Sequence, residues 1–98
     1  MELFEKLYDE NETVKVRFVG FTASETRFDF GIVYTNMFFG KPLVICMQTG
    51  RSTLLELNDS QDLEYLQAAF KIERAHAVEL AEFFKETLPE IPFQSQYE

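Results

Sequence analysis

The chain has one histidine and one cysteine, and these two side chains offer the widest choice of chemistry. His76 lies three residues after Glu73 and three before Glu79, so in a continuous helix the three side chains would share one side. Imidazole and carboxylate groups are ligands for several transition metals. A metal site also needs ligands that converge and a second shell, and surface charges on a helix account for the same spacing. We therefore expect no metal at this position.

Cys46 is the second candidate, as a nucleophile paired with His76. A catalytic thiol needs an accessible, electropositive environment that favours the thiolate. Cys46 lies instead between Ile45 and Met47 in an apolar strand pattern, where a cysteine is most often a small buried hydrophobic residue. The sequence has no nucleophile elbow, glycine-rich nucleotide loop or paired-cysteine motif. It thus identifies no catalytic residue and no cofactor, and it favours a protein that is not an enzyme.

Cys46 belongs to a predicted β-hairpin over residues 41–57, around which the other elements are arranged. Its first strand is apolar on both faces, which is typical of a strand inside a sheet. Pairing Gln48 with Ser52 across a turn that contains Gly50 places one apolar set on a single face: Leu43, Ile45, Met47, Leu55 and Leu57. The opposite face would hold Val44, Cys46 and Leu54 among polar residues, and would be only half covered.

An earlier hairpin is predicted from strands over residues 13–22 and 26–34, because apolar and polar residues alternate there. A pairing centred on Ser24 puts Phe18 opposite Phe30 and gives one continuous face of aromatic and β-branched residues. The reverse face would then be charged, and either wet or in contact with a partner.

Three helices are expected outside the strands. Residues 2–8 have the spacing of a short N-terminal helix, and a second helix begins at Asp59 or Ser60. The third runs from about residue 74 to residue 88 and ends before the proline that opens an extended tail over residues 89–98. We therefore predict one α+β domain over residues 1–98. Its four-stranded antiparallel β-meander, in the order 1-2-3-4, is covered on one face by the two C-terminal helices.

The charge of the chain is unevenly distributed. Residues 1–55 hold six basic and seven acidic residues, a net charge of −1, whereas residues 56–98 hold three basic and ten acidic residues, a net charge of −7. This acidic half repels phosphate backbones and anionic bilayers, so neither nucleic acid nor a membrane is an expected partner. The chain shows no signal peptide, and its single cysteine suits a reducing compartment, so we expect a cytoplasmic location.

Apolar residues in three places predict a contact with another protein or with a second copy of the chain. The loop over residues 35–41 contains Phe38 and Phe39, of which one could instead fold under the sheet as part of the core. The half-covered sheet face and the tail supply the other candidates: Val44, Leu54, Ile91, Phe93 and Tyr97. The leading hypothesis is a non-enzymatic protein-interaction module that forms a homodimer or binds a different protein.

A small-ligand pocket between the sheet and the helices is the alternative hypothesis. Such pockets are mostly apolar and have a few polar anchors. Phe30, Tyr34 and Phe84 would line this pocket, and Arg17 or His76 would lie at its mouth.

The stretch over residues 36–55, NMFFGKPLVICMQTGRSTLL, resembles a family of short bacterial proteins of unknown function from low-GC Gram-positive organisms. The resemblance extends over nearly the full length of the chain. It implies a cytosolic, single-domain protein without an assigned activity, and it transfers no functional residues.

Overall fold

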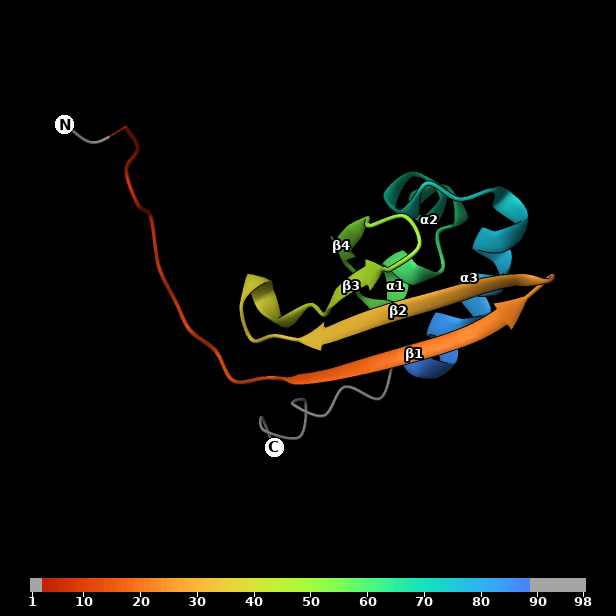
Figure 1. Cartoon of the computed structure of the whole chain (residues 1–98), viewed down its shortest axis with the longest axis horizontal. Coiled ribbons are helices and arrows are strands. Elements are labelled where there is room, and N and C mark those ends of the chain that lie inside the picture. Colours follow the sequence, from red (N-terminus) through yellow and green to blue (C-terminus); the bar gives the residue numbers. More distant parts are fainter. Residues whose placement is uncertain (1–2, 89–98) are drawn as a thin grey trace.

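The computed structural model describes residues 3–88, and it confirms an α+β arrangement with a four-stranded antiparallel sheet in the order β1-β2-β3-β4 (Figure 1). The strands are β1 (Lys15–Ala23), β2 (Thr26–Tyr34), β3 (Leu43–Cys46) and β4 (Ser52–Leu54). A 3₁₀ turn, η1 (Phe38–Gly40), joins β2 to β3, and the sheet is followed by α1 (Leu57–Ser60), α2 (Leu63–Phe70) and α3 (Arg74–Thr87). No helix within residues 3–88 has the length and apolar character needed to cross a membrane.

The first hairpin has a register that differs by one residue from the predicted one. Ser24 and Glu25 alone form its turn, and both have positive φ, 51° and 63°, as a type I′ turn requires. Phe18 is therefore opposite Gly31, and Val19 is opposite Phe30. Because side chains alternate along a strand, this shift moves a whole set of residues to the other face of the sheet. The prediction that Phe18 and Phe30 share one face is wrong.

The second hairpin also departs from the predicted register. Leu43 pairs with Leu54 and Ile45 with Ser52, so the connecting loop is longer than predicted. Val44 and Cys46 are fully buried under the helices, whereas Met47 is largely exposed on the opposite face. The predicted apolar face was assigned to the wrong side of the sheet, since the loop length decides which set of alternating residues turns inward.

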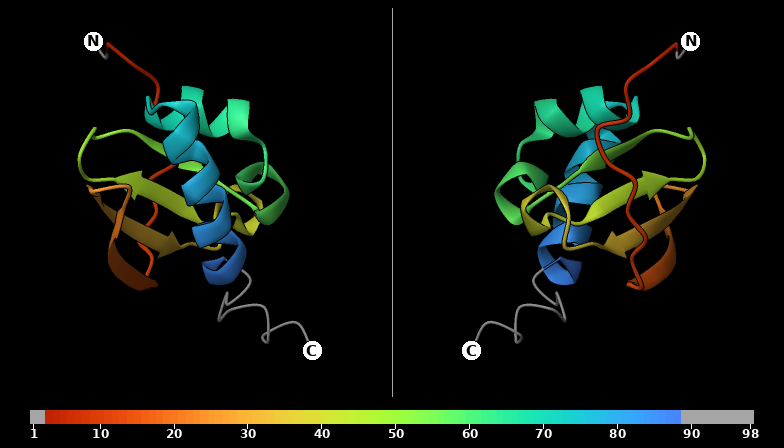
Figure 2. Two further views of the ribbon diagram at one scale, coloured as in Figure 1. Left: turned by 90° about the vertical axis from the view of Figure 1, so that its right-hand side faces the viewer. Right: turned by 90° about the vertical axis from the view of Figure 1, so that its left-hand side faces the viewer.

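The helices cover only one face of the sheet, which we call the inner face (Figure 2). The ring of Phe30 projects from this face and lies edge-on to Phe70 of α2 and Phe84 of α3, with ring centroids 5.5 and 5.4 Å apart. The third predicted helix is confirmed as α3, and an apolar stripe along it and its C-cap is buried: Ala77, Leu80, Ala81, Phe84 and Leu88. The second predicted helix, expected to begin at Asp59 or Ser60, is divided into α1 and α2. The N-cap of α2 is Asp62, whose side chain accepts a hydrogen bond from the Tyr65 backbone N–H at 3.1 Å.

The predicted N-terminal helix over residues 2–8 is not found within residues 3–8. This segment runs away from the domain (Figure 1), and its large apolar side chains are exposed. A helix this short has too few hydrogen bonds to offset its nucleation cost unless tertiary contacts stabilise it. The predicted tail, with Ile91, Phe93 and Tyr97, lies outside the described residues.

Candidate interaction surface

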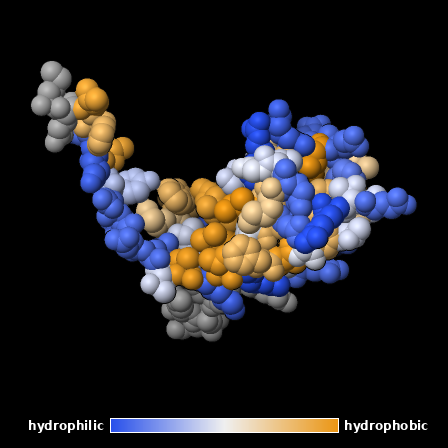
Figure 3. All heavy atoms as spheres, in the orientation of Figure 1, coloured by the Kyte–Doolittle hydropathy of each residue, from blue (hydrophilic) through white to orange (hydrophobic). Residues whose placement is uncertain are grey.

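The outer face of the sheet, opposite the helices, is apolar and uncovered within the part of the chain that the structure describes. Phe18, on the edge strand β1 beside Gly31, is 77% exposed, and Met47 on the other side of Gly31 is 48% exposed. Figure 3 shows this face, with apolar atoms gathered over the middle of the sheet. Strand alternation and pairing give the outer face these apolar residues: Val16, Phe18, Val33, Leu43, Ile45, Met47 and Leu54.

Gly31 on β2 leaves space on the outer face because it has no side chain. A Cβ atom at this position would lie 3.1 Å from Cε of Met47 and 3.4 Å from Cε1 of Phe18. These two side chains therefore approach each other over the glycine backbone, which leaves space for them. The result is a continuous apolar surface in place of separate protruding side chains.

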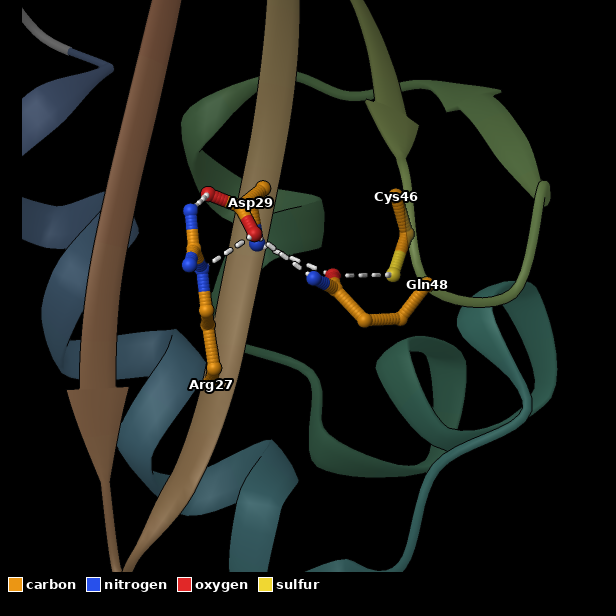
Figure 4. Close-up of polar contacts among 4 residues, drawn as sticks. All are labelled: Arg27, Asp29, Cys46 and Gln48. Carbon is orange, nitrogen blue, oxygen red and sulfur yellow. Dashed lines mark hydrogen bonds and ion pairs between the residues drawn. The ribbon is translucent and has the colours of Figure 1, made fainter.

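A polar network borders the outer face near the first turn (Figure 4). Arg27 donates two hydrogen bonds to the Asp29 carboxylate, from Nε at 2.8 Å and Nη2 at 3.2 Å. Gln48 donates to the same carboxylate at 2.7 Å and accepts from the Asp29 backbone N–H at 2.9 Å. The hydrogen bonds from Arg27, and then those from Gln48, hold the pKa of Asp29 below its usual value. This network fixes the end of β3 against β2 and places an ionised pair at the rim of the apolar surface.

Cys46 extends this network only weakly, with its Sγ atom 4.0 Å from Oε1 of Gln48. The residue is 0% exposed and faces the helices. A thiol in this position packs as a small apolar side chain and is inaccessible to a substrate.

His76 joins α3 to the tip of the first hairpin. Its Nδ1 lies 3.1 Å from Oε1 of Glu79, and its Nε2 lies 3.5 Å from the Thr26 hydroxyl. Ser24 donates a hydrogen bond to the other oxygen of Glu79. The hydrogen bonds from Ser24 and then His76 lower the pKa of Glu79. These contacts connect the hairpin to the helix. Within residues 3–88, no three potential ligands of the His, Cys, Asp and Glu types converge on one point.

The residues of the predicted ligand pocket lie in different parts of the described domain. Phe30 and Phe84 contact each other in the core, Tyr34 is buried, and Arg17 lies on β1 opposite Ile32. His76 borders a separate open hollow of about 580 Å³ at the far end of the sheet, lined also by Phe28, Gln48, Lys71 and other residues. The pocket between sheet and helices remains a prediction.

The residues of the predicted interaction surface are divided between core and surface. Phe39 is 100% exposed, and Phe38 is also exposed, with positive φ at both positions, 65° and 54°. Leu54 lies on the outer face opposite Leu43, whereas Val44 is buried in the core. The half-covered face predicted around Val44 is therefore the fully covered one.

Phe18, Met47 and Val16 are the surface residues that sequence reasoning missed. All three were assigned to the covered face, because the first turn was taken as three residues long and the second loop as too short. Recognition of the two-residue turn at Ser24 and Glu25 would have placed Phe18 and Val16 correctly.

These features define a class of protein: a small α+β domain with helices on one side of its sheet and, as far as residues 3–88 are concerned, an uncovered apolar surface on the other. The chain belongs to the SAV0927-like family, which matches residues 7–86. This is a small family of uncharacterised proteins, and the match confirms the resemblance found in the sequence. No curated protein matches the chain.

Proposed function

We propose that this domain is a non-enzymatic protein-interaction module that forms a homodimer through the outer face of its sheet. The observation that carries the proposal is the exposure of Phe18, which is 77% exposed on that face beside Gly31 and Met47. Contiguous apolar surface that is not covered is typical of sites for protein binding. Burial of such surface stabilises a complex by about 25 cal/mol for each Å² removed from water.

The polar rim supports the same proposal. Protein interfaces combine an apolar centre with a polar edge, and Arg and aromatic residues are enriched in them. Arg27 and Asp29 provide such an edge beside Phe18 and Met47. The buried position of Cys46 gives no support to thiol catalysis. A cytoplasmic location is part of the proposal, supported by the unpaired thiol.

Phe18→Asp is expected to convert the dimer to a monomer, because it places a charge at the centre of the apolar interface. We expect the dissociation constant to rise by at least about a hundredfold, from a desolvation cost of about 3 kcal/mol or more. Light scattering over a tenfold range of concentration measures the change. Val78→Asp is the matched control, since Val78 is an exposed apolar residue on α3. A folded Phe18→Asp protein that dimerises as the parent does, or a parent chain that is monomeric throughout, would contradict the proposal.

Binding of a small ligand in the interior is the second candidate function, and one observation favours it. The Tyr34 hydroxyl is buried and has no hydrogen-bond partner among residues 3–88. A buried polar group without a partner is destabilising, and a ligand that bonds to it would remove this cost.

Tyr34→Phe distinguishes an unsatisfied hydroxyl from a bonded one. If the hydroxyl has no partner, its removal is expected to raise the free energy of unfolding by about 1 kcal/mol, because the desolvation penalty disappears. Urea denaturation of both proteins measures the difference. A loss of stability of similar size would show that the hydroxyl is bonded by a group outside residues 3–88.

A further inference from the structure

Within residues 3–88, the segment before β1 extends from the domain and exposes its large apolar side chains. Residues 3–12, which we call the arm, run away from the sheet and end far from it (Figure 1). Phe4 is 74% and Leu7 86% exposed, and Leu3 and Tyr8 are also exposed. Exposure of this many large apolar side chains on one short segment is unfavourable in water, so the arm is suited to bind an apolar surface.

The C-terminal end of the arm is attached to the domain by hydrogen bonds to Glu12. The Glu12 carboxylate accepts hydrogen bonds from the Thr35 hydroxyl at 2.5 Å and from the Asn36 backbone N–H at 2.7 Å. The Thr35 hydroxyl in turn accepts from the Met37 backbone N–H at 3.0 Å. The arm therefore leaves the domain at the end of β2, in a fixed direction. The nine residues before Glu12 span about 30 Å when extended and about 14 Å as a helix.

A hollow of about 410 Å³ lies where the arm meets the loop after β2. Tyr8, Glu12 and Met37 are among the residues that line it. It is open to solvent, and apart from Met37 the residues named along it belong to the arm. Figure 3 shows the arm projecting from the body of the domain. A segment of another chain has room to pass at this point.

The arm and the segment that contains the sheet have opposite net charges. Residues 1–12 hold five acidic residues and one basic residue, a net charge of −4, whereas residues 13–55 hold five basic and two acidic residues, a net charge of +3. The helical half is strongly acidic, with a net charge of −7 over residues 56–98. Residues 13–55 are thus the segment of these three whose net charge is opposite to that of the arm. Lys15 and Arg17 project to the inner face, opposite Tyr34 and Ile32, so the attraction acts on the sheet as a whole, and the outer face contributes the apolar contact.

We propose that two copies of this chain exchange arms, so that the apolar residues of each arm cover the outer sheet face of the other copy. This inference rests on the proposed homodimer and identifies what occupies its interface. The exchange is reciprocal and closes on itself, as expected for a symmetric dimer. Leu3, Phe4, Leu7 and Tyr8 have the spacing of one side of a helix, so the arm becomes helical when the partner sheet supplies the contacts that it lacks alone.

The first test is the double variant Phe4→Ser/Leu7→Ser. Both side chains are exposed in the described monomer, so the fold is expected to stay intact while the dissociation constant of the dimer rises at least tenfold, measured by light scattering. Val78→Ser on α3, which shortens another exposed apolar side chain, is the matched control and is expected to leave the dissociation constant unchanged.

The second test is a disulfide between two different single variants, Phe4→Cys and Met47→Cys, mixed at equal concentration and oxidised. Exchange of arms brings the thiol of one chain to the sheet of the other, and the mixed disulfide is identified by its intact mass. Replacement of Met47→Cys by Glu82→Cys, on the exposed side of α3, is expected to abolish the mixed product. The native thiol of Cys46 is buried and does not compete.

The outcomes separate this inference from the proposed function. If Phe18→Asp dissociates the dimer but the arm variant does not, and no mixed disulfide forms, arm exchange is wrong and the sheet-face dimer stands. If the parent chain is a monomer at all concentrations, both are wrong. Loss of the dimer in the arm variant together with the mixed disulfide supports the exchange.

Discussion

Phe30→Ala is expected to lower the free energy of unfolding by about 3–5 kcal/mol, whereas Phe18→Ala is expected to change it by less than about 1 kcal/mol. The two side chains are of the same type and lie on neighbouring strands. Phe30 is buried between two aromatic rings of α2 and α3, so its truncation leaves a cavity. Phe18 is mostly exposed on the other face, so its truncation removes little packing within one chain.

Urea denaturation measures both values, at a concentration low enough to keep the chain monomeric. Phe84→Ala is a positive control, because Phe84 is buried against Phe30. Equal losses for the phenylalanines at positions 18 and 30 would mean that they share one face, and would contradict the observed register of the first hairpin.

The Cys46 thiol is expected to react with iodoacetamide at least about a thousandfold more slowly in the native domain than in the denatured chain. The reason is that Cys46 is 0% exposed, so that labelling requires the domain to open. Opening of a domain with a stability of 5 kcal/mol or more exposes the thiol in fewer than about one molecule in a thousand.

The matched control is a Glu82→Cys variant, whose added thiol lies on an exposed position of α3 and is expected to react at the rate of the denatured chain. Mass spectrometry of peptides follows the two thiols in the same molecule. Rapid labelling of Cys46 in the native protein would show that it is accessible, and would reopen the hypothesis of a thiol nucleophile.

The elements and their order were predictable because each has a strong local pattern. The stripe of α3 recurs at helical spacing over its full length, and the strands alternate clearly. Strand order followed from the tendency of sequential strands to pair. These are properties of segments, and they do not depend on how one segment faces another.

Which residues of the first hairpin face the core could not be predicted, because this depends on the length of one turn. Ser24 and Glu25 both adopt positive φ, a conformation that residues other than glycine seldom take. Neither is among the residue types that are typical of a type I′ turn. The apolar side chains of β1 offered no correction. Val16 and Phe18 on one face are as apolar as Val19 and Phe21 on the other, so either face could have been assigned to the core.

The arm was mispredicted for a related reason. Its spacing is that of a helix, but such a helix has no partner surface within residues 3–88. Without such a surface, a segment this short does not offset the cost of helix nucleation, whatever its spacing.

In strand β3, the two faces of the sheet place different requirements on alternate residues. It is only four residues long, and its side chains alternate between the core and the outer face. Val44 and Cys46 pack in the core, so a change at either position is expected to affect the stability of the fold. Leu43 and Ile45 lie on the outer face, so in the proposed dimer a change at either position is expected to affect the interface.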